Sequence, residues 1–389
     1  MIELNEVKKI SEEFGTPSFI FDLEVLKNRV TKMREITEGK YHLCYSIKAN
    51  PFLIPTMTEL VDNLEVCSPG ELAICEALHV PAEMIIYSGV NKGYKDVSEA
   101  FDYGVIHFTA ESIHHMELVS RVAEEKGRDV CILPRLTSGT QFGMSKEDLV
   151  YLIENRNQYP HVQIEGIHYF VGTQRKKLDR QRKELAMLKE LFAELRNEYQ
   201  IELKKLEYGP GLPVPLFEGE DFSDTLQPMK ELQETLSEVT EWAELTVEMG
   251  RFIATECGTY ITGVADMKSE YCILDGGMNH VNYVGQMMGM KNPVIRHIHT
   301  AENRDPKEWT LCGSLCTTND VMVRKITLEG LTIGDILSFE NIGAYSVTEG
   351  IYLFLSRTMP KVILRYGEGE YKLVRDALET SNFNTPVVE

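Results

Sequence analysis

Several polar residues of this 389-residue chain follow short apolar runs. A lysine amine in such a place can form a Schiff base with an aldehyde, and a carboxylate can hold a ring nitrogen protonated. Glycines and a hydroxyl group can surround a phosphate. Together these groups are what a protein needs to hold pyridoxal phosphate. The residues are Lys48, Thr173, Gly209, Gly211, Glu248 and Arg251.

Each of these features alone is weak evidence for a cofactor site. A lone lysine at the end of a strand is usually solvated, and a Gly-x-Gly turn is usually only a turn. A Glu-Arg pair is often a salt bridge. The joint placement of these residues at the ends of four different apolar runs is what favours a cofactor.

The apolar runs themselves predict the fold. From residue 41 to about 265 they alternate with helix-length amphipathic segments, and the alternation repeats eight times. The runs are HLCYSIK, NLEVCS, MIIYSG, HFTA, VCILPRL, IEGIHYFVG, LKKLEYG and ELTVEMG. This pattern predicts a (β/α)8 TIM barrel with a parallel sheet. Reactive side chains of such barrels come from the carboxyl ends of the strands, so we expect the residues above to meet at one mouth.

The alternation of strand-like and helix-like segments ends at about residue 265. Short strand-like runs separated by Gly, Asn and Asp turns follow, with little helical pattern. We expect a PLP-binding barrel over residues 25–265 and a mainly β domain, sandwich-like or barrel-like, over residues 1–24 and 266–389. The strand-like segment TPSFIFD, residues 16–22, is expected to pair with this second sheet.

Composition and charge exclude several classes of function. No apolar run approaches the roughly 20 residues of a membrane span, and the N-terminus has charges where a secretory signal has its apolar region. The formal net charge of −20 argues against a nucleic-acid partner. We therefore expect a cytoplasmic protein with neither a membrane nor a nucleic acid as its partner.

Two further features of the sequence predict no binding site. The eight cysteines lack the paired CxxC spacing of a zinc site, so we expect reduced thiols and no metal. The cluster Arg175-Lys176-Lys177 precedes an amphipathic run, LDRQRKELAMLKELFAEL. We interpret this cluster as the solvated start of a helix.

The chain resembles the fold-type III pyridoxal-phosphate decarboxylases, the family of diaminopimelate and ornithine decarboxylases. The similarity extends over nearly the whole length. It rests on the motifs YSIKANP, EVCSPGEL, QFGM, HYFVGTQ, YGPG, EMGR, DGGMN, CGSLCTTND and GDILSFENIGAY. The resemblance implies a decarboxylase with pyridoxal 5'-phosphate as its cofactor and a small-molecule amino acid as its substrate.

The resemblance also implies roles for individual residues. Lys48 would form the Schiff base with the cofactor, and Glu248 would pair with the ring nitrogen. Cys316 would reach into the active site of the other subunit and protonate the substrate carbon after CO2 leaves, which implies a homodimer with shared active sites. The residues implied to hold the phosphate or its turn are Thr173, Gly209, Gly211, Arg251 and Tyr345.

Four departures from the family pattern bear on the substrate. Phe170 replaces the second histidine of the strand-six motif, so it can stack on the cofactor ring but cannot titrate. Pro210 removes one backbone N–H from the phosphate turn. Thr317 replaces the acid that binds a distal ammonium group, although Asp320 is still available. Tyr283 or a neighbour stands where diaminopimelate decarboxylases have an arginine for the distal carboxylate.

Losing both the acid and the arginine argues against diaminopimelate, since each buried charge of that substrate would lack a partner at a cost of several kcal/mol. We expect the α-carboxylate to leave as CO2 from another amino acid, including one modified at its distal end or tethered to a carrier protein. The stretch QMMGM fits a looser apolar pocket, and equally a packed core or dimer interface.

Two alternatives to a decarboxylase stay open from the sequence. An amino-acid racemase would share the barrel and the lysine, but the Gly-x-x-Cys-x-x-x-Asp motif speaks against it. A degenerate homologue would bind a ligand or partner without catalysis. Phe170, Pro210 and Thr317 are the departures that favour this second alternative.

Overall fold

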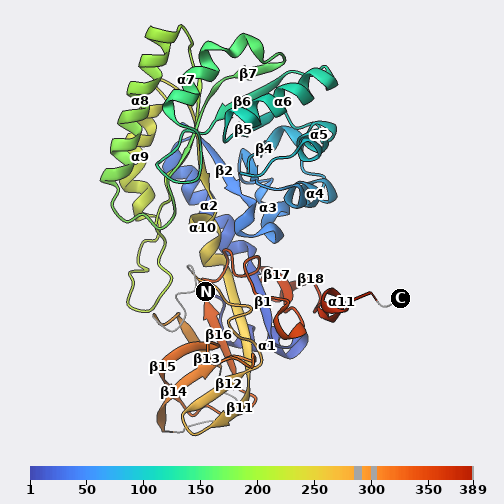
Figure 1. Ribbon diagram of the computed structural model, residues 1–389. Helices are drawn as coiled ribbons and strands as arrows, with labels where there is room; N and C mark the ends of the chain where they lie inside the picture. Colours follow the sequence, from blue (N-terminus) through green and yellow to red (C-terminus); the bar gives the residue numbers. More distant parts are fainter. Residues whose placement is uncertain (284–290, 299–304, 388–389) are drawn as a thin grey trace. The chain divides into compact units, whose positions relative to one another are not determined.

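The computed structural model of the chain divides into two compact units (Figure 1). We call them the barrel unit, Val30–Val214 with Asp224–Phe252, and the β unit, Met1–Arg29 with Pro215–Ser223 and Ile253–Glu389. The structure describes residues 1–283, 291–298 and 305–387. The Met-rich stretch QMMGM therefore lies outside the described residues.

The barrel unit is built on a parallel sheet in the order β7-β6-β5-β4-β3-β2-β10-β9-β8. Its strands are β2 (His42–Ser46), β3 (Asn63–Val66), β4 (Ile85–Tyr87), β5 (His107–Ala110), β6 (Val130–Pro134), β7 (Val162–Ile164), β8 (Gly166–Phe170), β9 (Lys205–Gly209) and β10 (Glu244–Met249). Only Glu165 separates β7 from β8, so these two segments together form the sixth predicted strand. The N–H of Leu136 donates to the carbonyl of His168 at 3.0 Å, which joins the end of β6 to β8. The predicted (β/α)8 barrel is confirmed.

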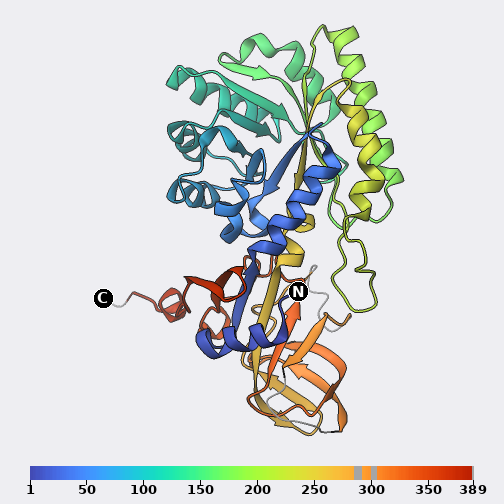
Figure 2. The same cartoon turned by 180° about the vertical axis from the view of Figure 1, so that it is seen from behind.

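Helices lie outside these strands, as Figures 1 and 2 show. They are α2 (Leu23–Thr37), α3 (Ile54–Met57), α4 (Pro69–Ala77), α5 (Tyr94–Tyr103), α6 (Ile113–Lys126), α7 (Lys146–Glu154), α8 (Asp179–Tyr199), α9 (Gln227–Val239) and α10 (Arg251–Ala254). Local sequence fixes several of their ends. The Ser68 hydroxyl caps α4 by accepting the N–H of Glu71, and Ser112 caps α6 in the same way through His115.

The β unit contains a sheet to which the N-terminal segment contributes. Its strands are β1 (Ser18–Asp22), β11 (Gly258–Lys268), β12 (Tyr271–Leu274), β13 (Ile295–Ile298), β14 (Pro306–Cys312), β15 (Val321–Glu329), β16 (Ile336–Glu340), β17 (Lys361–Gly367) and β18 (Glu370–Arg375). Two helices, α1 (Leu4–Phe14) and α11 (Ser381–Asn384), accompany them. β1 pairs antiparallel with β11 and parallel with β17, so residues 16–22 pair with the second sheet as expected.

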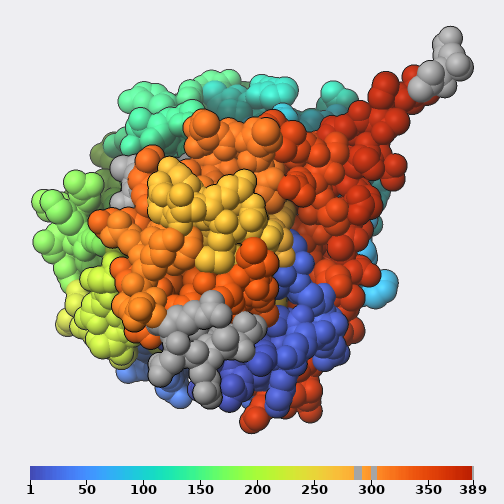
Figure 3. All heavy atoms as spheres, turned by 90° about the horizontal axis from the view of Figure 1, so that it is seen from below, coloured from blue at the N-terminus to red at the C-terminus, as the bar shows by residue number. Residues whose placement is uncertain are grey.

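A buried ion cluster ties the two ends of the chain together within the β unit. The Arg365 guanidinium on β17 donates to Glu6 of α1 at 3.0 Å, to Asp22 of β1 at 3.2 Å and to Glu24 at 2.7 Å. Arg365, Glu6 and Asp22 are all buried. Figure 3 shows the blue N-terminal segment beside the red C-terminal segment on this unit. The N-terminal residues are therefore part of the β unit's structure.

Among the described residues, no helix is long and apolar enough to cross a membrane. The longest of the helices given above, α8, is 21 residues long and follows the basic stretch 175–177. It carries charged residues along its whole length.

Replacing Arg365 by alanine tests the buried ion cluster. The change leaves two buried carboxylates without their cation, and we expect a loss of about 3 kcal/mol in the free energy of unfolding. Urea unfolding measures the difference. Lys372→Ala, an exposed cation on the neighbouring strand β18, is the matched control and should change stability by less than about 0.5 kcal/mol. Equal effects of the two variants would contradict the ion cluster's role.

Candidate active site

Lys48 lies just beyond the carboxyl end of β2, in the short helical turn Ile47–Ala49. The following turn begins at once, because the Asn50 side chain accepts the N–H of Phe52 at 3.1 Å. The Lys48 Nζ atom is 2.7 Å from Glu65 Oε2 and 3.7 Å from Glu248 Oε1. Both carboxylates are buried, whereas 38% of the Lys48 side chain is exposed. The amine therefore stands between two buried anions, with access to solvent.

Glu248 is held from two further sides. The Ser46 hydroxyl donates to Glu248 Oε1 at 2.9 Å, and His168 Nε2 lies 3.1 Å from Oε2. Burial alone would raise the pKa of Glu248, but the nearby Lys48 charge and the His168 hydrogen bond outweigh it and hold this pKa well below its usual range. Glu248 is therefore an oriented carboxylate at neutral pH.

His168 and Glu207 lie deeper in the barrel beside Glu248. One ligand-type atom from each of the three side chains lies within 4.8 Å of the others. Burial opposes the charged form of His168, but the hydrogen bond to Glu248 and the charge of that carboxylate raise its pKa above the ordinary value. Burial also raises the pKa of Glu207, to about 8. Neither oxygen of Glu207 has a hydrogen-bond partner among the described residues, which favours a protonated carboxyl group at pH 7.

Glu65, His168 and Glu207 were not among the site residues predicted from the sequence. The strand register explains why they meet Lys48 and Glu248, since His168 pairs with Glu207 and Glu65 pairs with Ser46 on adjacent parallel strands. Residues in register point to the same face of a sheet. The available signal was a charged or titratable residue inside an otherwise apolar run, as in NLEVCS and LEYG.

The ends of β8 and β9 form a cradle that has no room for a Cβ atom. A Cβ on Gly209 would lie 2.2 Å from Cδ2 of Phe170, and one on Gly211 would lie 1.8 Å from the carbonyl oxygen of Gly172. Gly211 also has a φ of +60°, which favours glycine. Both positions therefore require glycine, and Thr173, which follows Gly172, is exposed. The phosphate contacts predicted for these residues stay predictions.

Phe170 is the last residue of β8, and Arg251 follows the end of β10. The Arg135 guanidinium of the β6 end lies 5.8 Å from the Phe170 ring centroid. Arg251 is the first residue of α10, directly after β10, and is 8% exposed. With Lys48 and Glu248, these residues fit pyridoxal phosphate: an amine, a buried carboxylate, an aromatic face and a glycine cradle all lie at the carboxyl ends of the barrel strands.

Cys316 and Asp320 belong to the loop between β14 and β15 in the β unit. Cys316 is exposed, whereas Asp320 is buried. The Asp320 carboxylate accepts the N–H of Met278 at 2.8 Å and that of Leu315 at 2.7 Å. A Cβ on Gly313 would lie 2.3 Å from this carboxylate. The Gly-x-x-Cys-x-x-x-Asp spacing therefore folds the loop that presents Cys316, and the predicted substrate contact of Asp320 stays a prediction.

The other predicted residues of the β unit are also described within it. Thr317 is half-buried, and its hydroxyl accepts the N–H of Asn319 at 3.3 Å. The Tyr283 hydroxyl donates to the Glu340 carbonyl at 2.7 Å inside the unit. Tyr345 has a φ of +71°, and its carbonyl accepts two N–H groups of the following turn. Their contacts with substrate or phosphate stay predictions.

Replacing Glu207 by glutamine tests its protonation. Folding raises the pKa of Glu207 from about 4.5 to about 8, so the folded protein keeps a proton that the unfolded chain loses in this pH window. Wild-type stability should therefore fall as pH rises through the window and level off above it. We expect the stability of Glu207→Gln relative to wild type to rise there, by at most roughly 1.4 kcal/mol per pH unit.

Urea unfolding of the ligand-free protein across this pH range measures the difference. Glu241→Gln, an exposed carboxylate, serves as the control and should give a flat difference. A flat difference for Glu207→Gln as well would show that Glu207 is ionised in the folded protein.

Comparisons with known proteins bear on the family of this chain. Residues 23–255 match the family described as pyridoxal-dependent decarboxylase, pyridoxal binding domain. The chain is 25% identical to diaminopimelate decarboxylase of Aquifex aeolicus over 397 residues, which covers 96% of this chain and 92% of the relative. It is also 25% identical to the L-glutamyl-[BtrI acyl-carrier protein] decarboxylase of Niallia circulans, with 95% and 93% covered.

A solved structure shows the same fold. Diaminopimelate decarboxylase from M. jannaschii in complex with L-lysine matches with a TM-score of 0.84 and 22% identity, covering 98% of this chain and 94% of that one. The family match extends over more than half of this chain. The chain therefore belongs to the pyridoxal-dependent decarboxylases.

Proposed function

We propose that this decarboxylase acts on an amino acid whose distal end carries no free ammonium group, such as an amide or thioester conjugate. The observation that carries the proposal is the loop after Cys316. Thr317 is neutral, and the nearest acid, Asp320, is 3% exposed and already accepts two N–H groups. A distal ammonium group brought to this loop would lose its hydration without gaining an ionised partner, which is unfavourable.

One relative supports a tethered substrate. The Niallia circulans protein is named for an L-glutamyl group on an acyl-carrier protein, and it covers 95% of this chain. Diaminopimelate decarboxylases are equally similar in identity, so overall similarity does not separate the two substrates. The neutral residue at position 317 is what favours the conjugated substrate here.

The residues of the barrel have separable roles in the proposed reaction. Bound pyridoxal phosphate supplies the electron sink for the bond between Cα and the leaving carboxylate. Lys48 holds the cofactor covalently, and Glu65 positions the amine through its 2.7 Å contact. Glu248 would accept a hydrogen bond from the protonated ring nitrogen, since its low pKa keeps it ionised. Phe170 offers an aromatic face to the ring.

The phosphate and the proton donor complete the proposed site. Thr173, Gly209, Gly211, Arg251 and Tyr345 hold the phosphate. Cys316 donates a proton to Cα once CO2 has left, and the thiol comes from the partner subunit of a homodimer. The exposure of Cys316 on its loop is consistent with such a contact, because the thiol is accessible.

Lys48→Arg tests the covalent anchor without leaving Glu65 and Glu248 unpaired. An arginine keeps a positive charge between the carboxylates but cannot bond the aldehyde. We expect the purified variant to fold, to lack the visible absorption band of the lysine-bound cofactor and to lose at least about 10³-fold in activity. Lys189→Arg, at an exposed position of α8, should keep both band and activity. A variant at position 48 with a normal band would refute the assignment.

The substrate proposal is tested by measuring CO2 release from free diamino acids and from their distal amides. We expect the wild-type enzyme to prefer the amides by at least about tenfold in kcat/KM. Thr317→Glu should shift this preference toward the free diamino acids, since it supplies the missing anion. Thr318→Glu adds the same charge at the next, exposed position and is the control. Efficient wild-type turnover of diaminopimelate would overturn the proposal.

A further inference from the structure

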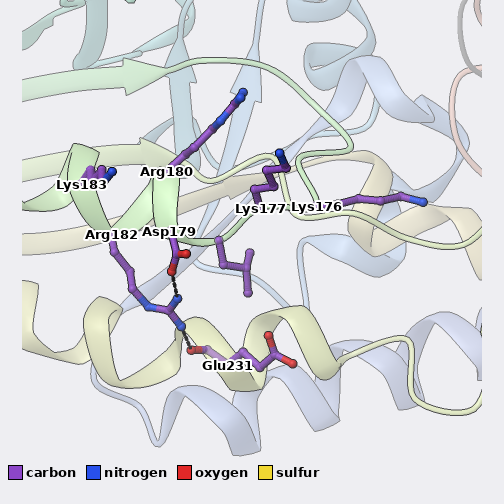
Figure 4. Close-up of a pocket in the computed structure, with 8 residues that line it drawn as sticks. Lys176, Lys177, Asp179, Arg180, Arg182, Lys183 and Glu231 are labelled. Atoms are coloured by element: carbon purple, nitrogen blue, oxygen red, sulfur yellow. Dashed lines mark hydrogen bonds and ion pairs between the residues drawn. The ribbon is translucent and has the colours of Figure 1, made fainter.

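A strongly basic segment stands out in a chain of net charge −20. Residues 175–183 contain six of the 40 Lys and Arg residues and a single acid, Asp179. Five exposed cations of this segment, which we call the basic cluster, surround a depression of about 500 Å³ (Figure 4). The basic cluster consists of Lys176, Lys177, Arg180, Arg182 and Lys183.

Only part of the positive charge of the basic cluster is neutralised by ion pairs with described residues. Arg182 is engaged, since it pairs with Asp179 at 2.8 Å and donates to the Glu231 carbonyl at 3.0 Å. Within the described part of the chain, Lys177, Arg180 and Lys183 form no ion pair. Figure 4 shows Lys177 and Arg180 extending away from the Arg182 and Asp179 pair. The usual interpretation, a solvated helix start, does not account for so many uncompensated charges on an acidic protein.

The segment is anchored on the proposed phosphate cradle. The N–H of Arg175 donates to the Gly211 carbonyl at 2.9 Å, and Gln181 donates to the Pro210 carbonyl at 3.0 Å. The Arg175 guanidinium pairs with Glu184, which also accepts the Tyr208 hydroxyl at 2.8 Å. The basic cluster is thus held in place just outside the carboxyl ends of β8 and β9.

We propose that the basic cluster docks the acidic surface of a carrier protein that presents the tethered amino acid to the site. This inference rests on the proposed function. The cations are exposed and spread around an open depression, which suits many weak contacts with an acidic protein surface. They do not converge in a buried pocket, as recognition of a small anion requires. The charge of the whole chain disfavours nucleic acid as the occupant.

The test reverses the three cations that form no ion pair with a described residue. The variant Lys177→Glu/Arg180→Glu/Lys183→Glu changes the charge by the same amount as its control, Lys189→Glu/Arg196→Glu/Lys204→Glu. The three control residues are exposed, in the middle of α8, near its C-terminal end and just beyond it. The probes are L-glutamyl acyl-carrier protein and a small L-glutamyl thioester. Two quantities are measured, CO2 release and binding of the unloaded carrier protein in low and high salt.

We expect the cluster variant to lose at least about tenfold in kcat/KM with the carrier substrate and to keep its rate with the small thioester. Carrier binding should weaken with salt in the wild type and be lost in the variant. The control variant should match the wild type in every assay.

Other outcomes overturn one proposal or the other. Equal loss with both probes would make the cluster a small-anion site, and no loss with either would make it solvated surface. Wild-type turnover of the small thioester without carrier binding would also overturn the docking inference. Turnover of diaminopimelate with neither thioester accepted would instead overturn the proposed function.

Discussion

The ion triad of Lys48 with Glu65 and Glu248 is the interaction on which the site depends. Two carboxylates that are almost fully buried carry a large desolvation cost, and a nearby ammonium group offsets it only at close range. The barrel provides that range by placing β2 between β3 and β10 as parallel neighbours. The amine is held by charge, with 38% of the side chain open to solvent. The same ion triad thus offsets the burial of the two carboxylates and positions the solvent-accessible Lys48 amine.

His168 and Glu207 explain how the buried Glu248 stays ionised. His168 donates from below and has a raised pKa, so it contributes positive charge. Glu207 would cancel that charge if it were ionised, but burial raises its pKa to about 8. A neutral Glu207 leaves the positive charge of His168 for Glu248. Because one of the three acids is protonated, the net charge of this group of residues is close to zero. The acids are Glu65, Glu207 and Glu248, and the cations are Lys48 and His168.

The site residues at the strand ends could be predicted from the sequence, but those in the barrel interior could not. Lys48 and Glu248 were predictable because each closes an apolar run, and the carboxyl ends of barrel strands meet at one mouth. Glu65, His168 and Glu207 were not, since strands buried on both faces show no alternation that tells inward from outward residues. The register between paired strands shows which residues point into the barrel, and this register is defined only in the folded structure.

Spacing motifs were informative about loops and less so about contacts. The family resemblance, carried in part by Gly-x-x-Cys316-x-x-x-Asp320, implied a proton donor and a substrate-binding acid. The structure adds that the Asp320 carboxylate accepts the N–H of Leu315 in its own loop and that of Met278 in the segment after β12, which no spacing rule reveals. Similarly, the sequence of residues 175–177 predicted only a helix start. The hydrogen bonds of Arg175 to Gly211 and of Gln181 to Pro210 place this segment at the mouth of the barrel.

Covalent trapping of the cofactor tests the central claim, that Lys48 is its anchor. The strongest rival is Lys92, a buried amine whose pKa burial lowers to about 8 and which donates to the Gly89 carbonyl. Borohydride reduction of the holoenzyme followed by peptide mass spectrometry locates the modified lysine. We expect the pyridoxyl group on the peptide that contains Lys48 and none on the peptide that contains Lys92. Modification of Lys92 with an unmodified Lys48 would contradict the account.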